Sequence, residues 1–389
     1  MAAQPELRRI KPLEWEFMIR YEQVCLESFG YCLPDEIVTS DDLEQQLRPL
    51  YERLRLPEGR LELITGVRER RFWPVGALPS QPSVQSGLAA IAAAELPASH
   101  VQALIHASVC RDFLEPATAC AVHHGMGLNS ECLIFDLSNA CLGLLNGVTQ
   151  IANMIELGQI RAGLVVGTEG SRQLVETTVA ELNRDTGLTR QQMKRALASL
   201  TIGSASCAVL LVHQSLSQTG NRLLGACARA HTQFHNLCHS GNDEAVGSGM
   251  QPLMETDSER LLQEGVATGA ANFTDFLQGM NWSRRQIDKT FCHQVGPTHQ
   301  KMMFEALGLE PMLDFSTVGW LGNTGSVALP ITMAIGSERG HLRPHDKVAL
   351  LGIGSGINCL MLGIEWQRAL VQQATPSRPA RPLPQGELV

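Results

Sequence analysis

Two stretches of the chain share one order of apolar runs and helical segments. The first starts at Leu104 and reads LIHASV, a helix ending in Gly-Leu, CLIFDL, an Asn-containing turn, a Gly-rich helix and LVVGTEG. The second starts at Thr290 and reads TFCHQV, a helix ending in Gly-Leu, MLDFST, an Asn-containing turn, a Gly-rich helix and ALLGIGSG. Short apolar runs bounded by turn residues predict buried strands, and strands separated by helices predict mostly parallel sheets with helices on both faces. The pattern therefore predicts an α/β protein made of two similar halves.

The repeat also sets the expected boundaries of the parts of the chain. The first half spans 20–215 and contains a helical insertion at about 174–200, whereas the second half spans 220–366. Residues 1–19 form an N-terminal extension, and 367–389 form a tail rich in Pro and Arg. A segment of this composition has little apolar surface to bury, so the tail is expected to be disordered.

Composition excludes several classes of protein. Hydrophobic residues make up 44% of the 389 residues and charged residues 18%, which is typical of a folded protein with a sizeable core. The net charge of −8 disfavours nucleic-acid binding, because it offers no positive field to a polyanion. The longest apolar run, 348–364, is interrupted by glycines and is shorter than the roughly 18 residues of a membrane span. The first twenty residues lack the apolar stretch of a secretory signal. The eleven cysteines form no Cys-x-x-Cys pair and are interpreted as free thiols, so a reducing cytoplasm is the expected location.

Positions at which the two halves differ are candidates for functional groups. A residue that has no equivalent in the other half is not required by the shared fold. At the turn before the long helix, the first half has Cys141 in SNACLG and the second has Asn323 in LGNTGS. At the end of an earlier strand, the second half has His293 where the first has His106. A thiolate at a helix N-terminus is stabilised by unpaired N–H groups that lower its pKa, so Cys141 is a candidate nucleophile rather than one more core cysteine. The side chains of His293 and Asn323 can direct N–H donors at an oxyanion or an enolate.

One loop is longer in the first half. From the histidine of the first strand to the Gly-Leu helix end, the first half has 22 residues and the second has 16. The first loop is therefore six residues longer, and it carries Asp112 and Glu115. A carboxylate on an element that the shared fold does not require is a candidate for a functional role.

A group of metal-ligating residue types occurs in the segment HTQFHNLCHS. His231, His235, Cys238 and His239 include the i, i+4 spacing of a zinc site. No second ligand pair lies at the distance found in zinc fingers, so no metal is expected. The segment is predicted to be a polar loop at the rim of a pocket or a surface helix.

Two further motifs each have a structural and a functional interpretation. The GIGSG run at 352–356 resembles half of a dinucleotide fingerprint, but no long strand-helix-strand unit follows it. It is therefore predicted to be a tight turn whose backbone N–H groups face the cysteine. Arg68, Arg70 and Arg71 form a basic patch that is either a solvated strand end or a contact for an anionic carrier such as acyl-CoA.

The ordered motifs resemble those of ketoacyl synthase III enzymes in the thiolase superfamily. The resemblance covers 25–366 and rests on the order Cys141, His293, Asn323 and on the segments GYCLP, TGVRERR and GIGSG. It is strongest to the bacterial enzymes that join two acyl chains head to head in hydrocarbon synthesis, through SVCRDFLEPATA, NACL, NLC and ALLGIGSGINC. The resemblance implies a thiolase-like fold with a layered α-β-α-β-α core of two stacked sheets, a homodimer, acyl-CoA as substrate and no cofactor.

The resemblance also implies roles for individual residues. Cys141 takes the first acyl chain from coenzyme A, and the backbone N–H groups of Cys141 and Ser355 hold its carbonyl oxygen. His293 and Asn323 hold the thioester oxygen of the second acyl-CoA. Glu115 is the candidate base, because joining two plain acyl-CoA molecules requires removal of an α-proton, whereas a decarboxylating synthase needs no such base.

The predicted activity is a ping-pong Claisen condensation without decarboxylation, and three alternatives stay open. They are a decarboxylating synthase that uses a malonyl thioester, an acyl-CoA thioesterase, and a non-catalytic binder with the same fold. Arg60 and Ile64 replace the Trp and Arg with which ketoacyl synthase III usually grips its carrier, so CoA and acyl-carrier protein are both candidate carriers. The sequence predicts neither the acyl chain length nor the downstream enzyme that accepts a β-keto product.

Overall fold

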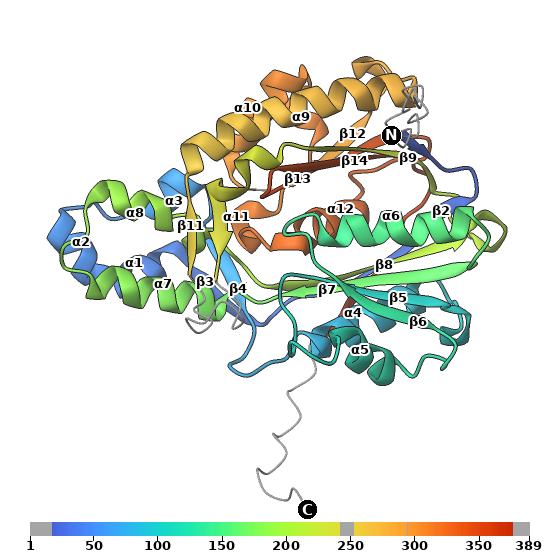
Figure 1. Cartoon of the computed structure of the whole chain (residues 1–389), viewed down its shortest axis with the longest axis horizontal. Coiled ribbons are helices and arrows are strands. Elements are labelled where there is room, and N and C mark those ends of the chain that lie inside the picture. The colour runs from blue at the N-terminus through green and yellow to red at the C-terminus, as the bar shows by residue number, and fades with distance from the viewer. Residues whose placement is uncertain (1–17, 242–252, 294, 376–389) are drawn as a thin grey trace, which may run out of the picture.

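Figure 1 shows the computed structural model, which describes residues 18–241, 253–293 and 295–375. The strands are β1 Met18–Arg20, β2 Val24–Cys32, β3 Glu36–Thr39, β4 Glu69–Phe72, β5 Ala103–Ala107, β6 Leu133–Leu137, β7 Ala162–Glu169, β8 Ala205–His213, β9 Arg222–Ala230, β10 Cys238–Ser240, β11 Met254–Thr256, β12 Lys289–Cys292, β13 Lys347–Gly354, β14 Asn358–Glu365 and β15 Val371–Ala374. The helices are α1 Ser40–Gln46, α2 Arg48–Leu54, α3 Arg60–Thr65, α4 Ser80–Ala93, α5 Thr118–Met126, α6 Gly143–Glu156, α7 Arg172–Arg184, α8 Arg190–Ala196, α9 Ser258–Met280, α10 Pro297–Leu307, α11 Val318–Leu321 and α12 Ala328–Glu338.

The main sheet repeats one strand arrangement in its two halves. In the first half β5 pairs in parallel with β6 and β7, β7 is antiparallel to β8, and β8 is antiparallel to β2. In the second half β12 pairs in parallel with β13 and with a bridge at Asp314, β13 is antiparallel to β14, and β14 is antiparallel to β9. The same directions in the same order confirm the predicted duplicated α/β arrangement. The prediction of mostly parallel sheets is wrong, because each half adds antiparallel strands beside its parallel ones.

The two half-sheets form one hydrogen-bonded sheet of eleven strands. The joint is narrow, because β2 and β9 share a single register pair, Cys25 with Arg222. The sequence predicts two stacked sheets and gives no sign of this joint. The structure therefore has the predicted layers, with a backbone contact that connects them at one edge.

Helices lie in three layers around the half-sheets (Figure 1). The helices α9 and α10 cover one half-sheet, α4 and α5 cover the other, and α6 and α12 lie between them. Every residue of α12 from Ala328 to Ser337 is buried, as expected for a helix that is apolar around its whole circumference. The layered α-β-α-β-α core is thus confirmed.

The predicted disorder of 367–389 is wrong for its first part. Strand β15 pairs in parallel with β2, and the Tyr31 hydroxyl contacts Gln373 Oε1 at 3.3 Å. The side-chain amide of Asn221 also donates to the Arg368 carbonyl at 2.7 Å. The edge of β2 beside the joint offers unpaired N–H and C=O groups, and this polar segment satisfies them. Residues 376–389, and 1–17 of the predicted N-terminal extension, lie outside the described part of the chain.

The segment predicted to be an insertion in the first half contains α7 and α8. Both helices pack away from the main sheet, beside α1 to α3 (Figure 1). Across the described ranges, no helix is both long and apolar enough to span a membrane. The boundaries of the two halves stay a prediction.

Candidate active site

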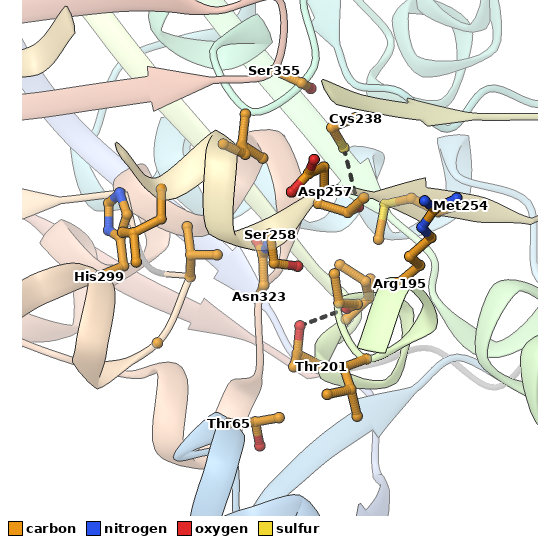
Figure 2. A pocket seen from close by; sticks show the side chains of 18 of the residues that line it. Thr65, Arg195, Thr201, Cys238, Met254, Asp257, Ser258, His299, Asn323 and Ser355 are labelled. Atoms are coloured by element: carbon orange, nitrogen blue, oxygen red, sulfur yellow. Dashed lines mark hydrogen bonds between the residues drawn. The ribbon is translucent and has the colours of Figure 1, made fainter. Parts of the chain in front are cut away.

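A cavity of about 1280 Å³ lies at the carboxyl ends of the parallel strands of both halves. The loops after β5, β6 and β12 contribute to its walls, and α3, α8 and the β10–β11 hairpin enclose it. Figure 2 shows this space with His299, Asn323 and Ser355 among its labelled side chains. Cys141, His293, Asn323 and Ser355 all line it, so the structure brings the predicted residues of both halves together.

Cys141 lies on a tight turn two residues before α6. Ala140 has a φ of 44°, in the left-handed region that residues other than glycine seldom adopt. The turn is held from two sides, because Asn139 Nδ2 donates to Asn146 Oδ1 at 2.8 Å and Asn358 Nδ2 donates to Asn139 Oδ1 at 3.3 Å. These contacts fix Cys141 at the wall of the cavity.

The predicted lowering of the Cys141 pKa is wrong. Burial raises the pKa of the Cys141 thiol to about 12, and the neighbouring Cys238 thiol and Glu169 carboxyl act in the same direction. A backbone hydrogen bond opposes them, but removal of the charged form from water outweighs it. Cys141 is therefore a protonated thiol at neutral pH and must lose its proton as it reacts.

The GIGSG run lies against Cys141, but its first three residues end strand β13, so the predicted tight turn begins only at Ser355. A Cβ atom at Gly354 would lie 3.5 Å from the Cys141 backbone nitrogen and 3.6 Å from its Cβ atom. The absence of a side chain at Gly354 thus keeps open the space beside the Cys141 N–H group. Ser355, the next residue, lines the same cavity.

Asn323 is oriented by its own turn. Its backbone N–H donates to the Thr201 carbonyl at 2.9 Å, and its carbonyl accepts from Gly203 N–H at 2.9 Å. A Cβ atom at Gly203 would lie 1.8 Å from the Leu321 carbonyl oxygen, so only glycine permits this approach. The Gly325 N–H donates to Asn323 Oδ1 at 3.0 Å. The carbonyl side of the amide is therefore occupied, and the NH₂ group keeps its donors for the cavity.

His293 follows β12 and is buried. Its backbone N–H donates to the Leu351 carbonyl at 3.1 Å, and its ring Nδ1 has no hydrogen-bond partner among the described residues. Burial lowers the pKa of His293 to about 3, and the nearby His299 ring adds to this effect. Burial also lowers the pKa of His299 to about 4. Both rings are therefore neutral near pH 7, and a neutral imidazole offers one N–H donor and one acceptor.

The buried carboxyl group of Asp314 bonds to Cys292, the residue before His293. Asp314 accepts from the Cys292 N–H at 3.0 Å, from the Thr290 hydroxyl at 3.2 Å and from Gln300 Nε2 at 2.7 Å. Burial raises the pKa of Asp314 to about 7, although these donors oppose the shift. Asp314 thus ties β12, which ends beside His293, to α10, which carries His299.

Glu115 does not line the cavity of its own chain, and its side chain is exposed. The neighbouring Phe113 and Leu114 are 57% and 48% exposed. The start of the loop is fixed, because the Asp112 carboxylate accepts from Ser80 N–H at 2.9 Å. Within one chain the structure therefore does not bring Glu115 to Cys141.

The assignment of Arg70 to acyl-CoA binding is wrong. Its side chain is fully buried and donates to the Val38 and Leu200 carbonyls and to Ser40 Oγ. Burial lowers the pKa of Arg70 to about 10. Alternation along β4 turns Arg70 into the protein and its neighbours outward.

The other two arginines of the predicted patch, Arg68 and Arg71, do not line the cavity. Arg68 is exposed beside Glu69, and Arg71 donates to the Pro34 carbonyl at 2.8 Å. The basic side chains that do line the cavity come from α3 and α8 and are Arg60, Arg190, Lys194 and Arg195.

The histidine-rich segment contributes to the cavity rim. Cys238 and His239 line the cavity from β10, whereas His231 Nδ1 contacts Thr268 Oγ1 at 2.9 Å. His235 Nδ1 contacts a carbonyl of its own turn. Within the ranges that the structure describes, no group of three or more His, Cys, Asp or Glu residues is arranged to hold a metal ion.

Two residues that line the cavity are not predicted from the sequence. Glu169 ends β7 and is 5% exposed, and His299 lies in the first turn of α10. The repeat contains a signal for Glu169, because LVVGTEG aligns with LLGIGSG and places Glu169 opposite Ser355. A charged residue at that strand end has no counterpart in the other half.

Comparison with known proteins agrees with the fold and the site. Residues 83–229 match the family described as thiolase, N-terminal domain, and residues 277–366 match 3-oxoacyl-[acyl-carrier-protein (ACP)] synthase III C terminal. The acyl-CoA:acyl-CoA alkyltransferase of Shewanella oneidensis is 42% identical over 90% of this chain and 100% of its own length. The protein of the same name from Xanthomonas campestris is 30% identical over 89% of this chain and 99% of its own length.

Solved structures of OleA from Xanthomonas campestris have the same fold. A variant with alanine in place of a cysteine superimposes with a TM-score of 0.84, at 29% identity over 91% of this chain and 99% of that one. A variant with serine in place of a cysteine, solved with bound lauric acid and lauroyl-CoA, has a TM-score of 0.83 at 29% identity, over 89% of this chain and 100% of that one. The duplicated fold, the shared cavity and these similarities together show that the chain belongs to the acyl-CoA:acyl-CoA alkyltransferase family of thiolase-like condensing enzymes, to which OleA is also similar.

Proposed function

We propose that this protein joins two acyl-CoA molecules by a Claisen condensation without decarboxylation. The products are a 2-alkyl-3-oxoacyl-CoA and free coenzyme A. The observation that carries the proposal is that Cys141, His293, Asn323 and Ser355 line one cavity of about 1280 Å³. This volume exceeds the roughly 300–1000 Å³ of an ordinary small-molecule site, as two acyl chains require. The names of the relatives and the lauroyl-CoA bound by OleA support the same substrate class.

In the first step Cys141 takes an acyl group from acyl-CoA. The bond between the acyl carbon and the CoA sulfur breaks, and a bond to Cys141 Sγ forms. Because burial keeps the thiol protonated, its proton must pass to a base, and neutral His293 has an unprotonated ring nitrogen for this purpose. The proton then leaves with the CoA thiol. The backbone N–H groups of Cys141 and Ser355 hold the thioester oxygen.

In the second step another acyl-CoA loses an α-proton to Glu115. His293 and Asn323 donate to the enolate oxygen that forms, and the free NH₂ group of Asn323 suits this role. The α-carbon attacks the acyl carbon on Cys141, and the Cys141 thiolate leaves and regains a proton. No cofactor takes part in this scheme.

We assign Glu115 to the active site of a partner subunit in a homodimer. Its own cavity does not include it, whereas its loop exposes Phe113 and Leu114 outside that cavity, by 57% and 48%. Two adjacent large apolar side chains at the exposed end of a loop fit a surface that another chain covers.

The basic side chains of α3 and α8 that line the cavity replace the arginines of β4 as the proposed contacts for CoA phosphates. The protein is expected to act in the cytoplasm. A β-keto thioester is reactive, so the proposed pathway partner is an enzyme that reduces or otherwise consumes it.

The experiment that tests the activity combines a panel of acyl-CoA substrates with mass spectrometry of products and of the intact protein. We expect a condensed product and an acyl adduct on the wild-type protein, and neither on Cys141→Ala. Release of labelled CO₂ from malonyl-CoA as a condition of condensation would instead indicate a decarboxylating synthase. Fatty acid without condensed product would indicate a thioesterase.

Mixed dimers test the assignment of Glu115. The base subunit carries Cys141→Ala with Glu115 intact, and the acyl subunit carries Glu115→Ala with Cys141 intact. Each parent homodimer is expected to lack condensation. If Glu115 acts across the dimer, the mixed dimer contains one complete site and regains activity. A mixed dimer as inactive as its parents, with exchange verified by native mass spectrometry, would contradict the assignment.

A further inference from the structure

Glu169 is a buried acidic residue of the cavity that the proposed reaction does not use. It ends β7, lines the cavity and is 5% exposed. Its Oε1 atom accepts from Val109 N–H at 3.0 Å, from Ser326 N–H at 3.3 Å and from the Ser326 hydroxyl at 2.5 Å. Its Oε2 atom accepts from Cys110 N–H at 3.3 Å. The donors belong to two segments that are far apart in the sequence.

One of these segments is the turn that orients Asn323. Ser326 follows Asn323 by three residues, and Gly325 lies between the carboxyl group and the Asn323 amide. A Cβ atom at Gly325 would lie 3.0 Å from Glu169 Cγ, and Gly325 has a φ of +58°, so glycine is required here on both counts. The Gly325 N–H is the donor that fixes Asn323 Oδ1. Glu169 therefore holds the turn that aims the Asn323 NH₂ group into the cavity.

The other segment is the start of the loop that carries Glu115. Val109 and Cys110 both donate to Glu169, and the Cys110 sulfur also accepts from Gly170 N–H at 3.3 Å. Farther along, Asp112 is held by Ser80 N–H. The loop is thus fixed at its base, and its exposed end, with Glu115, extends from that base.

We propose that Glu169 is a positioning residue for both parts of the condensation step: it holds Asn323 in the active site of its own subunit and the Glu115 loop that serves the partner subunit. The loop part of this inference rests on the proposed function, since it requires Glu115 to act across a dimer. Glu169 itself touches neither substrate nor Cys141 in this role.

Glu169→Gln preserves the shape of the side chain and removes its ability to accept at both oxygens. The amide NH₂ group must face at least one N–H donor of Val109, Cys110 or Ser326, and two donors cannot bond to each other. In the homodimer we expect condensation to fall about 10- to 100-fold, the range for loss of a charged hydrogen bond. Acylation of Cys141 should not fall, because loss of the Glu169 charge removes one of the effects that raise the pKa of Cys141. A general loss of structure would lower both half-reactions and the unfolding temperature together.

Mixed dimers separate the two parts. The base subunit, with Cys141→Ala, supplies only Glu115 to the one complete site, and the acyl subunit, with Glu115→Ala, supplies Cys141 and Asn323. Adding Glu169→Gln to the base subunit therefore tests the loop alone, and adding it to the acyl subunit tests the Asn323 turn alone. We expect each addition to lower condensation at least about fivefold without changing the acyl adduct on Cys141.

Ser326→Ala is the matched control, because it removes a donor to Glu169 from the Asn323 turn and leaves Val109 and Cys110 untouched. It should lower condensation when placed in the acyl subunit and have no effect in the base subunit. If condensation by an active mixed dimer is unchanged when Glu169→Gln is added to the base subunit, the loop part of the inference is overturned. If it is unchanged when Glu169→Gln is added to the acyl subunit, the Asn323 part is overturned. Mixed dimers without activity before Glu169 is changed would instead overturn the trans arrangement of Glu115, and with it the loop part. The two half-reactions of the Ser326→Ala homodimer, in which the Val109 and Cys110 contacts of Glu169 remain, still decide the Asn323 part.

Discussion

The reactivity of Cys141 depends on a balance between burial and the start of a helix. Burial is the larger effect and raises its pKa to about 12. Because the thiolate is the reactive form, alkylation of the free enzyme by iodoacetamide should increase about tenfold per pH unit between pH 7 and 9 without reaching a plateau. Peptide-resolved mass spectrometry of labelling at several pH values measures this. A plateau below pH 8 would mean that the helix start dominates.

This behaviour changes how a catalytic role can be recognised. Fast alkylation does not distinguish an enzyme from a non-catalytic binder when the nucleophile is protonated at rest. Acyl transfer from the thioester does distinguish them, because the proton leaves during that reaction. The acyl adduct is therefore the decisive observation for Cys141.

The oriented amide of Asn323 should act in only one half-reaction. Replacing it with alanine removes an N–H donor to the enolate, and loss of one such donor slows a reaction by about 10² to 10³. We expect Asn323→Ala to slow condensation by this factor and to leave acylation of Cys141 largely intact. Rapid-quench mass spectrometry of each half-reaction checks the split. An effect on adduct formation alone would mean that Asn323 donates to the thioester oxygen on Cys141 and not to the enolate oxygen.

At the residue scale, the sequence predicts which residues form the site better than it predicts their burial and protonation. Comparison of the two halves removes residues that the fold requires and leaves Cys141 and Asn323, and the order of the motifs adds His293. All three line one cavity. The pKa of Cys141 and the burial of Arg70 could not be predicted in this way. Both depend on how much water surrounding elements exclude, and no local pattern contains that quantity.

At the scale of elements, the apolar strand runs and Gly-Leu helix ends predict the duplicated topology because they reflect local geometry and burial. Strand β15 has no such signal: its sequence VQQA is polar, and its burial is only partial. It is a strand because β2 has a free edge beside the joint of the two half-sheets. Such pairing depends on what the rest of the chain leaves available, so a local pattern cannot predict it.

The capping of α8 links an element to substrate binding. The Thr189 hydroxyl accepts from Gln192 N–H at 3.3 Å, and Gln192 Oε1 accepts from Thr189 N–H at 2.9 Å. Thr189→Ala removes this cap at a cost of about 1 kcal/mol. Because α8 lines the cavity, we expect the KM for acyl-CoA to rise about two- to fivefold with little change in kcat. Steady-state kinetics with varied acyl-CoA measures both.

The chain contains a matched control for this prediction. Thr39 caps α1 with the same reciprocal pair, through Asp42, and α1 does not line the cavity. Thr39→Ala should lower the unfolding temperature by a similar amount and leave the KM unchanged. Equal changes in KM for both variants would show that general stability, and not the wall of the cavity, is responsible.

At the scale of the whole molecule, the site needs both halves in one fixed relation. Cys141 comes from the first half, whereas His293, Asn323 and Ser355 come from the second. The helices α6 and α12 both lie between the half-sheets (Figure 1), and buried residues of both helices belong to one hydrophobic core. Close packing of such a layer transmits small shifts, so mutations there are expected to affect catalysis as well as stability.

The buried titratable groups predict how stability depends on pH. The pKa values of His106, His293, His299 and His341 are all lowered by burial, so below about pH 6.5 the unfolded chain binds more protons at these histidines than the folded chain does. Asp314 acts in the opposite sense, because its folded pKa of about 7 lets only the folded chain hold that proton between about pH 7 and 4. Four histidines favour protonation of the unfolded state and one carboxyl group opposes them, so the unfolding temperature should fall between pH 7 and 5.

Asp314→Asn isolates the opposing group. Without the carboxyl group, the proton that favours the folded state is lost and the histidines with lowered pKa values act alone. The variant should be less stable at acidic pH, and its unfolding temperature should decline more steeply between pH 7 and 5 than that of the wild type. Calorimetry of both proteins at constant ionic strength measures the two slopes. Equal slopes would mean that Asp314 does not hold its proton in the folded state. A wild-type unfolding temperature that is constant or rises toward pH 5 would mean that the buried histidines do not stay neutral.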